Sequence, residues 1–255
     1  MARDLADLPL LAHTHGQPAT PTTMGKELAV AAFRLRRQLA RVSGTAYLGK
    51  FNGATGTYGA HLAAVPDHDW QATSRAFVEG LGLAWNPLTT QIESHDWQAE
   101  VYADMARFNR ILHGLAVDMW TYISKGYFAQ VRGQGTVGSS TMPHKVNPIR
   151  FENAEANLEV STALLDVLGS TLVESRMQRD LTDSSMQRNI GTAFGHSLLA
   201  IDNVCRGLAG LDAVPAGMAA DPAGHLGGLA EPIPSALAGP PRQGVGGGGH
   251  NPCSI

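Results

Sequence analysis

One polar stretch decides how this chain is organised: Gly138-Ser139-Ser140-Thr141-Met142-Pro143-His144-Lys145-Val146-Asn147-Pro148-Ile149. It has turn formers at both ends and no apolar periodicity. Hydroxyls, an imidazole, an ammonium and an amide all fall within the nine positions from Ser139 to Asn147. The glycines at 133, 135 and 138 predict a flexible approach. Pro148 can begin a helix whose apolar face runs through Phe151, Leu158, Leu165 and Leu168. The pattern favours a polar lid on a rigid helix over an ordinary solvated loop.

Residues Gly138 to Pro148 resemble the signature loop of the fumarase/aspartase superfamily, whose members eliminate fumarate. The form with His144 and Val146, followed by Phe151-Glu152-Asn153, is similar to the adenylosuccinate lyase family. Three more segments resemble that family and occur in its order: Thr14-His15-Gly16-Gln17-Pro18-Ala19-Thr20, Thr89-Thr90-Gln91-Ile92-Glu93 and Gln178-Arg179-Asp180-Leu181-Thr182-Asp183-Ser184-Ser185. Any one segment is weak support, whereas together they are strong.

Composition excludes several classes of protein. The 255 residues can bury a core, and the hydrophobic fraction of 44% with 16% charged residues is ordinary for a soluble protein. A net charge of −3 gives no electrostatic case for nucleic acid or an anionic membrane. Two cysteines exclude a disulfide framework, and we find no membrane span and no signal peptide. These features predict a cytoplasmic protein.

The apolar spacing predicts helices over residues 24–42, 69–81, 94 to about 130, 148–172 and 182–211. No strand-like alternation competes, so we expect an all-α fold of the long-helix bundle type. One chain cannot cover every apolar stripe of such helices. We therefore expect a homo-oligomer formed through the central helices, and the resemblance implies a homotetramer whose active sites are shared between subunits.

Two regions are expected along the chain. Residues 1–212 should form the central helical-bundle lyase domain. Residues 213–255, which are rich in Gly and Pro, should form a disordered remnant of a C-terminal domain. The resemblance also places a domain before Leu8 and a helical cap after Leu211, both missing here. On that basis we expect the chain as written to be a poor enzyme or none, because catalysis draws on remote substrate contacts.

The resemblance implies three catalytic residues. Ser139 would be the general base, as an alkoxide in a desolvated site near a cation. His15 would be the general acid for the leaving nitrogen, since imidazole holds both protonation states near neutrality. Glu152 would orient the catalytic histidine. Without the resemblance these would be taken as a turn serine, a surface histidine and a solvated glutamate.

The resemblance also implies substrate-binding residues. Lys145 and Asn147 would hold the succinyl carboxylates, with charge and a directional donor for the carbanion. The positions of Thr14, Gln91 and Ser140 resemble further substrate contacts. A phosphate site for the nucleotide would comprise Arg179, Ser184, Ser185 and Arg188, although the alternative of a solvated helix end is about as favourable.

The sequence contains no spacing typical of a metal site and no nucleotide-cofactor fingerprint, so we expect no cofactor. The predicted activity is elimination of fumarate from N6-succinyl-AMP, and from succinyl-aminoimidazole-carboxamide ribotide, in purine biosynthesis. One alternative is a catalytically incomplete fragment that keeps only helical self-association. Another is a different fumarate-releasing enzyme, of the argininosuccinate or carboxymuconate type.

Overall fold

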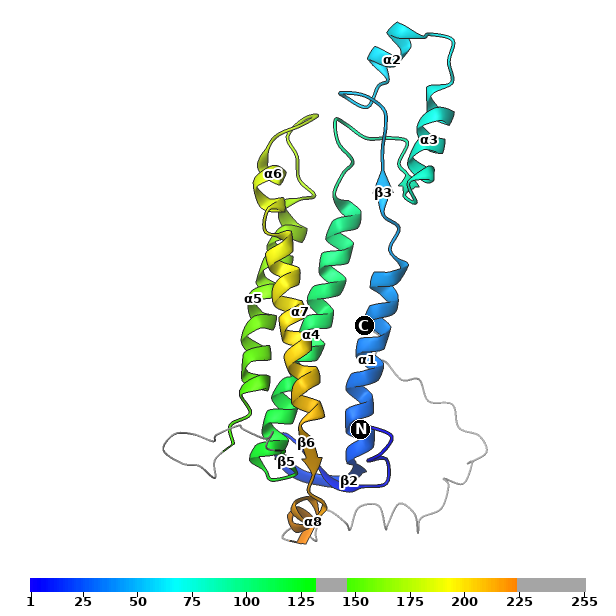
Figure 1. Cartoon of the computed structure of the whole chain (residues 1–255). Coiled ribbons are helices and arrows are strands. Elements are labelled where there is room, and N and C mark those ends of the chain that lie inside the picture. Colours follow the sequence, from blue (N-terminus) through cyan, green and yellow to red (C-terminus); the bar gives the residue numbers. More distant parts are fainter. Residues whose placement is uncertain (132–145, 224–255) are drawn as a thin grey trace, which may run out of the picture. The chain divides into compact units, whose positions relative to one another are not determined.

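The computed structural model describes residues 1–131 and 146–223 (Figure 1). Helices hold most of these residues, which confirms the predicted all-α class, and the strands form three two-stranded sheets. The chain divides into two units. The first comprises Met1–Lys26 with the chain from Pro215 onward, and the second comprises Glu27–Val214.

The first unit is a hairpin covered by a short helix. Strands β1 (Pro9–Thr14) and β2 (Gln17–Thr23) pair antiparallel, and helix α8 (Pro215–Ala223) packs against β1. Leu10, Leu11 and Met218 are buried there. The sequence did not predict the hairpin, because its prolines argue against a strand; a two-stranded sheet tolerates them, since it is all edge. The sequence also did not predict α8, which lies in the segment expected to be disordered.

Helix α1 (Met24–Gly44) confirms the predicted helix over 24–42. Its apolar stripe is only partly covered by this chain: Leu28 is buried, whereas Leu39 is 51% exposed. A polar contact attaches it to α4 instead, where Arg41 Nε donates to the buried Asp104 at 2.8 Å and Arg107 bonds the same carboxylate. The predicted stripe is therefore not the face that packs within one chain.

A small region precedes the long helices of the second unit. It contains β3 (Leu48–Gly49), α2 (Gly59–Ala64), α3 (Trp70–Gly80) and β4 (Ala84–Trp85), with β3 and β4 parallel. Asp69 caps α3 by accepting from Ala72 N at 2.9 Å, and Gly82 follows the helix with φ of +79°. These local signals are why the sequence predicted this helix almost to the residue.

Helices α4 (Asp96–Ser124), α5 (Ile149–Thr171) and α7 (Ile190–Ala209) pack along one another and form the core (Figure 1). Buried apolar side chains fill the contacts between them: Tyr102, Ala106, Leu165, Leu168, Leu172 and Ala193. A buried polar network also joins the three helices. Asn109 donates to Ser161 Oγ at 2.9 Å, and Ser197 donates to Asn109 Oδ1 at 3.0 Å. The network fixes one register for the three helices, because a slipped register would leave these groups unpaired.

Several predicted helix ends were wrong. Ser94 does not cap α4, because its hydroxyl bonds the Asp96 carboxylate and His95 is the N-cap residue. The helix ends at Ser124, since β5 (Phe128–Gln130) pairs antiparallel with β6 (Leu211–Ala213). The helix predicted over 182–211 is interrupted after α6 (Thr182–Gln187). Among the described residues, none of the helices combines the length and apolar character needed to cross a membrane.

Candidate active site

His15 lies in the two-residue turn of the β1–β2 hairpin, where Thr14 pairs with Gln17. His15 and Gly16 have φ of 56° and 74°, so both occupy the left-handed region that such hairpin turns require. Asn-Gly is the usual choice for this turn, and a non-glycine residue such as histidine in the left-handed region carries some backbone strain. Strain of this kind concentrates at functional sites. The turn presents Thr14 and His15 exposed at the tip of the first unit.

In the second unit, the loop before α4 meets the segment around α6. Gln91 N donates to the Gln178 carbonyl at 3.3 Å, so the predicted substrate residue Gln91 adjoins the segment that carries Arg179. Ser184, Ser185 and Arg188 follow on α6 and at its C-terminal end, and all three are exposed. We call this region, residues 86–95 and 174–189, the α6 end. The structure thus brings together five predicted site residues that lie almost 100 positions apart.

The Asp183 carboxylate is hydrogen-bonded to several residues of the α6 end. Arg179 Nη1 donates to its Oδ2 at 2.6 Å, Ser184 N donates to its Oδ1 at 2.7 Å, and His95 Nε2 lies 3.2 Å from Oδ2. Burial by itself would raise the Asp183 pKa, but these hydrogen bonds outweigh it and hold the pKa below the usual value. Sequence reasoning assigned no role to Asp183 or His95. The contact joins residues 88 positions apart, and only the position of Asp183 in the Gln178–Ser185 motif pointed to it.

The loop over residues 49–59 supports the α6 end from the other side. Asn52 Nδ2 donates to Thr89 Oγ1 at 2.8 Å, and Lys50 Nζ donates to the Gly53 carbonyl at 2.9 Å. Burial lowers the Lys50 pKa. Gly56 touches the Thr89 carbonyl so closely that a Cβ would stand 1.9 Å from that oxygen. The loop therefore fixes the backbone directly before Gln91.

Two other predicted residues lie where α5 begins. Asn147 is exposed just before the helix, and Glu152 is exposed in its first turn and accepts a hydrogen bond from Trp120 Nε1 at 3.1 Å. We call residues 146–152 the α5 start. Ser139, Ser140 and Lys145, with His144, lie outside the described residues.

The α5 start and the α6 end lie at opposite ends of the same helix. Helix α5 has 23 residues, which corresponds to a length of about 35 Å. Within one chain, Glu152 and Asn147 therefore cannot reach a small substrate that is bound by Gln91 and Arg179. The second unit divides its predicted residues between two places.

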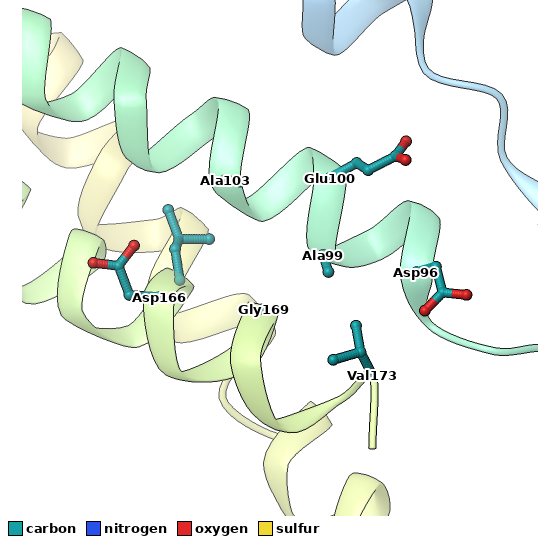
Figure 2. Close-up of a pocket in the computed structure, with 8 residues that line it drawn as sticks. Asp96, Ala99, Glu100, Ala103, Asp166, Gly169 and Val173 are labelled. Atoms are coloured by element: carbon teal, nitrogen blue, oxygen red, sulfur yellow. The ribbon is translucent and has the colours of Figure 1, made fainter. Parts of the chain in front are cut away.

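A pocket between α4 and α5 is a poor alternative site (Figure 2). Ala99, Ala103 and Gly169 let the two helices approach, and the Glu100 carboxylate points away from α5. The charged residues that line the pocket are Asp96, Glu100 and Asp166, all acidic. Such a lining repels an anionic ligand, and no predicted site residue contributes to it. Among the described residues, no group of three His, Cys, Asp or Glu could hold a metal ion.

Comparison with known families matches most of the chain. The family described as Lyase matches residues 1–160, and the family described as Adenylosuccinate lyase C-terminal matches residues 175–245. The adenylosuccinate lyase of Escherichia coli K12 is 51% identical over 214 residues, which are 82% of this chain and 47% of that protein. The adenylosuccinate lyase of Vibrio cholerae is 46% identical over 238 residues, 93% of this chain and 52% of that protein. The chain spans about half the length of these relatives.

Solved structures support the fold. The 3-carboxy-cis,cis-muconate lactonizing enzyme of Pseudomonas putida superposes with a TM-score of 0.72 at 23% identity, over 93% of this chain and 53% of that one. The fumarate lyase of Mesorhizobium sp. BNC1 has a TM-score of 0.67 at 21% identity, over 85% of this chain and 48% of that one. At these identities the likeness concerns the fold alone.

Proposed function

Because this chain belongs to the lyase family and to its adenylosuccinate lyase branch, we propose that it eliminates fumarate from N6-succinyl-AMP and from succinyl-aminoimidazole-carboxamide ribotide. The observation that carries the proposal is the α6 end. There Gln91 is bonded to the backbone directly before Arg179, whose guanidinium is partly exposed, and two exposed serines follow on α6. That donor set suits an anionic nucleotide far better than the acidic pocket between α4 and α5.

In the proposed reaction, Ser139 removes a proton from the substrate carbon beside a carboxylate. The electron pair spreads into that carboxylate, where Lys145 and Asn147 stabilise the developing charge. The carbon–nitrogen bond then breaks to give fumarate, and His15 returns a proton to the departing nitrogen of AMP. Glu152 orients the histidine, and both side chains are exposed.

Binding is assigned to the remaining residues. Arg179 and Arg188 supply charge for the nucleotide phosphate, and Ser184 and Ser185 supply hydroxyl donors. Thr14, Gln91 and Ser140 contact the succinyl part. Asn52 and Gly56 hold the backbone directly before Gln91 in place. Ordering this loop on substrate binding therefore costs little conformational entropy.

We further propose that the functional form is a homotetramer whose sites combine residues from different chains. Two features support it: the separation between the α5 start and the α6 end, and the uncovered side of α1. On α1, Val30, Phe33 and Leu39 are 44%, 74% and 51% exposed. Apolar patches of this kind mark contact surfaces between chains.

The test is incubation of the purified chain with N6-succinyl-AMP, and separately with argininosuccinate. Fumarate is followed by its absorbance and AMP by chromatography. We expect fumarate and AMP in equal amounts from the nucleotide and no fumarate from argininosuccinate. If fumarate is released from argininosuccinate but not from N6-succinyl-AMP, the proposed nucleotide substrate is wrong. If neither compound releases fumarate, the proposed lyase activity is wrong.

A further inference from the structure

His95 stands behind the proposed nucleotide site without forming part of its surface. It is the last residue before α4, and its side chain is only 12% exposed. Two groups from the α6 segment flank its Nε2 atom: Asp183 Oδ2 at 3.2 Å and the Gln187 side-chain amide at 3.1 Å. A residue before one helix is thus hydrogen-bonded to both ends of another.

The hydrogen bonds fix where the proton lies. The Asp183 carboxylate is ionised, because Arg179 is bound to the same oxygen, and it can only accept. His95 Nε2 must therefore carry the hydrogen and donate it. A Gln187 nitrogen could not donate to the same atom, so the amide is turned with its oxygen toward Nε2. The oxygen and nitrogen of an amide are assigned from such a network.

We propose that His95 is a positioning residue: by donating to Asp183, it holds the Arg179 guanidinium in the orientation that receives the nucleotide phosphate. This rests on the proposed function. Asp183 Oδ2 accepts from His95 and Arg179 together, whereas Oδ1 is held by Ser184 N. Without the imidazole donor, Oδ2 is held on fewer sides, and the guanidinium bonded to it is less firmly oriented. Within the part of the chain that the structure describes, the Arg179 guanidinium is hydrogen-bonded through Nη1 alone, which leaves its other side-chain donors for a ligand.

The arrangement also links two segments of the site. Gln91 lies four positions before His95, and Arg179 lies four positions before Asp183. The His95–Asp183 bond and the Gln91–Gln178 backbone bond therefore tie the same two loops at both edges. We expect the phosphate contact to be equally strong in the bound substrate and in the transition state, so its loss should raise KM and leave kcat nearly unchanged.

The test compares His95→Met, which keeps the size but lacks the donor, with His95→Gln, whose amide nitrogen stands near the position of Nε2. His113→Met is the matched control. His113 lies on α4 and, like His95, faces a carboxylate, since its Nε2 is 3.4 Å from Glu159 Oε1. It is far from the α6 end along the helix. AMP affinity is measured by calorimetry, KM and kcat by fumarate release, and Arg179 order by its guanidinium NMR signal, identified with Arg179→Lys.

We expect His95→Met to weaken AMP binding and raise KM about tenfold, the loss of one charge-assisted contact, with kcat nearly unchanged. The Arg179 signal should broaden in this variant, His95→Gln should restore both properties, and His113→Met should change neither. An unchanged guanidinium signal and unchanged AMP affinity in folded His95→Met would overturn the proposal. If the parent chain neither binds AMP nor releases fumarate, the proposed function fails, while the guanidinium signal still decides whether His95 positions Arg179.

Discussion

The α6 end and the α5 start differ in how much of their order one chain supplies. At the α6 end, Arg179 is tied to Asp183, and Gln91 is tied to the Gln178 backbone. At the α5 start, Asn147 and Glu152 are exposed, and the Glu152 carboxylate accepts from Trp120 Nε1. Among the described residues, the α6 end is therefore pre-organised within the chain, whereas the α5 start exposes its predicted site residues.

The contrast indicates a division of labour. Groups that only bind can be fixed in advance by their own chain, because the ligand comes to them. On the proposed mechanism, the groups that transfer protons meet residues of another chain, because α5 keeps the two ends about 35 Å apart. Variants that stop the chemistry should therefore differ from variants that weaken binding, and both should differ from variants that only loosen the helices between the two ends.

The largest effect on turnover is expected from removing the proposed general base. Ser139→Ala should lower fumarate release by about two to four orders of magnitude, the usual contribution of a general base. AMP affinity and the unfolding midpoint should stay unchanged, since binding is assigned to the α6 end. Stopped-flow absorbance and calorimetry measure the two quantities. Near-normal turnover in Ser139→Ala would exclude this serine as the base.

Arg179→Gln should show the opposite pattern. Removing a hydrogen bond to a charged group costs about 1.5–3 kcal/mol, so AMP affinity should fall by about 10- to 150-fold. The rate at saturating substrate should change much less. Arg110→Gln is the control, because Arg110 pairs with Asp166 away from both ends. If the two variants bind AMP equally well, the phosphate site is not at the α6 end.

Asp104→Asn should loosen α1 without affecting either end. Asp104 is buried against two half-exposed arginines, and we expect a loss of about 1–3 kcal/mol in the free energy of unfolding. Although burial alone would raise the Asp104 pKa, hydrogen bonds from Arg41 and Arg107 hold it below the ordinary 3.8. The stabilisation is then fully present above about pH 4 and is lost as the pH falls through the lowered pKa.

Denaturant titrations of the parent chain and Asp104→Asn between neutral pH and pH 3 measure this difference. The difference in the free energy of unfolding between the parent chain and Asp104→Asn should shrink only at acid pH. A gap that stays constant down to pH 3 would mean that the Asp104 charge contributes nothing to stability.

The smallest expected effect lies between the two ends. Ser161→Ala should remove the hydrogen bonds that Asn109 and Ser197 make with the Ser161 hydroxyl. We expect this loss to lower the free energy of unfolding by about 1–2 kcal/mol. AMP affinity should not change. Chemical denaturation checks the first expectation and calorimetry the second. A stabilised variant would show that the polar network does not hold the three helices together.

Local signals were enough to predict α3 and α5 from the sequence. Asp69 and Gly82 bound one helix, and Pro148 begins the other. Ends set by contacts far along the chain were missed. Helix α4 ends early because β5 pairs with β6, and the first hairpin is held by pairing and by α8. No local pattern encodes those partners.

The site followed the same rule. Motif resemblance named Gln91 and Arg179, but nothing in either segment indicated that Gln91 N donates to the carbonyl of Gln178, the residue before Arg179. His95 and Asp183 were missed because a histidine before a helix and an aspartate within one are ordinary in isolation. Their significance comes from burial and from a partner 88 positions away.

The most direct test of the central claim asks whether separate chains supply the two ends of one site. On this account Ser139→Ala lacks the general base, and the double variant Gln91→Ala/Arg179→Ala releases little fumarate when the substrate concentration is far below its KM. Both are expressed in one cell with different tags, and mixed assemblies are purified through both tags. At that substrate concentration we predict that the mixed assemblies release more fumarate from N6-succinyl-AMP than either variant, because some sites then combine Ser139 of one chain with an intact α6 end of another. Mixed assemblies as inactive as either variant alone would contradict the claim.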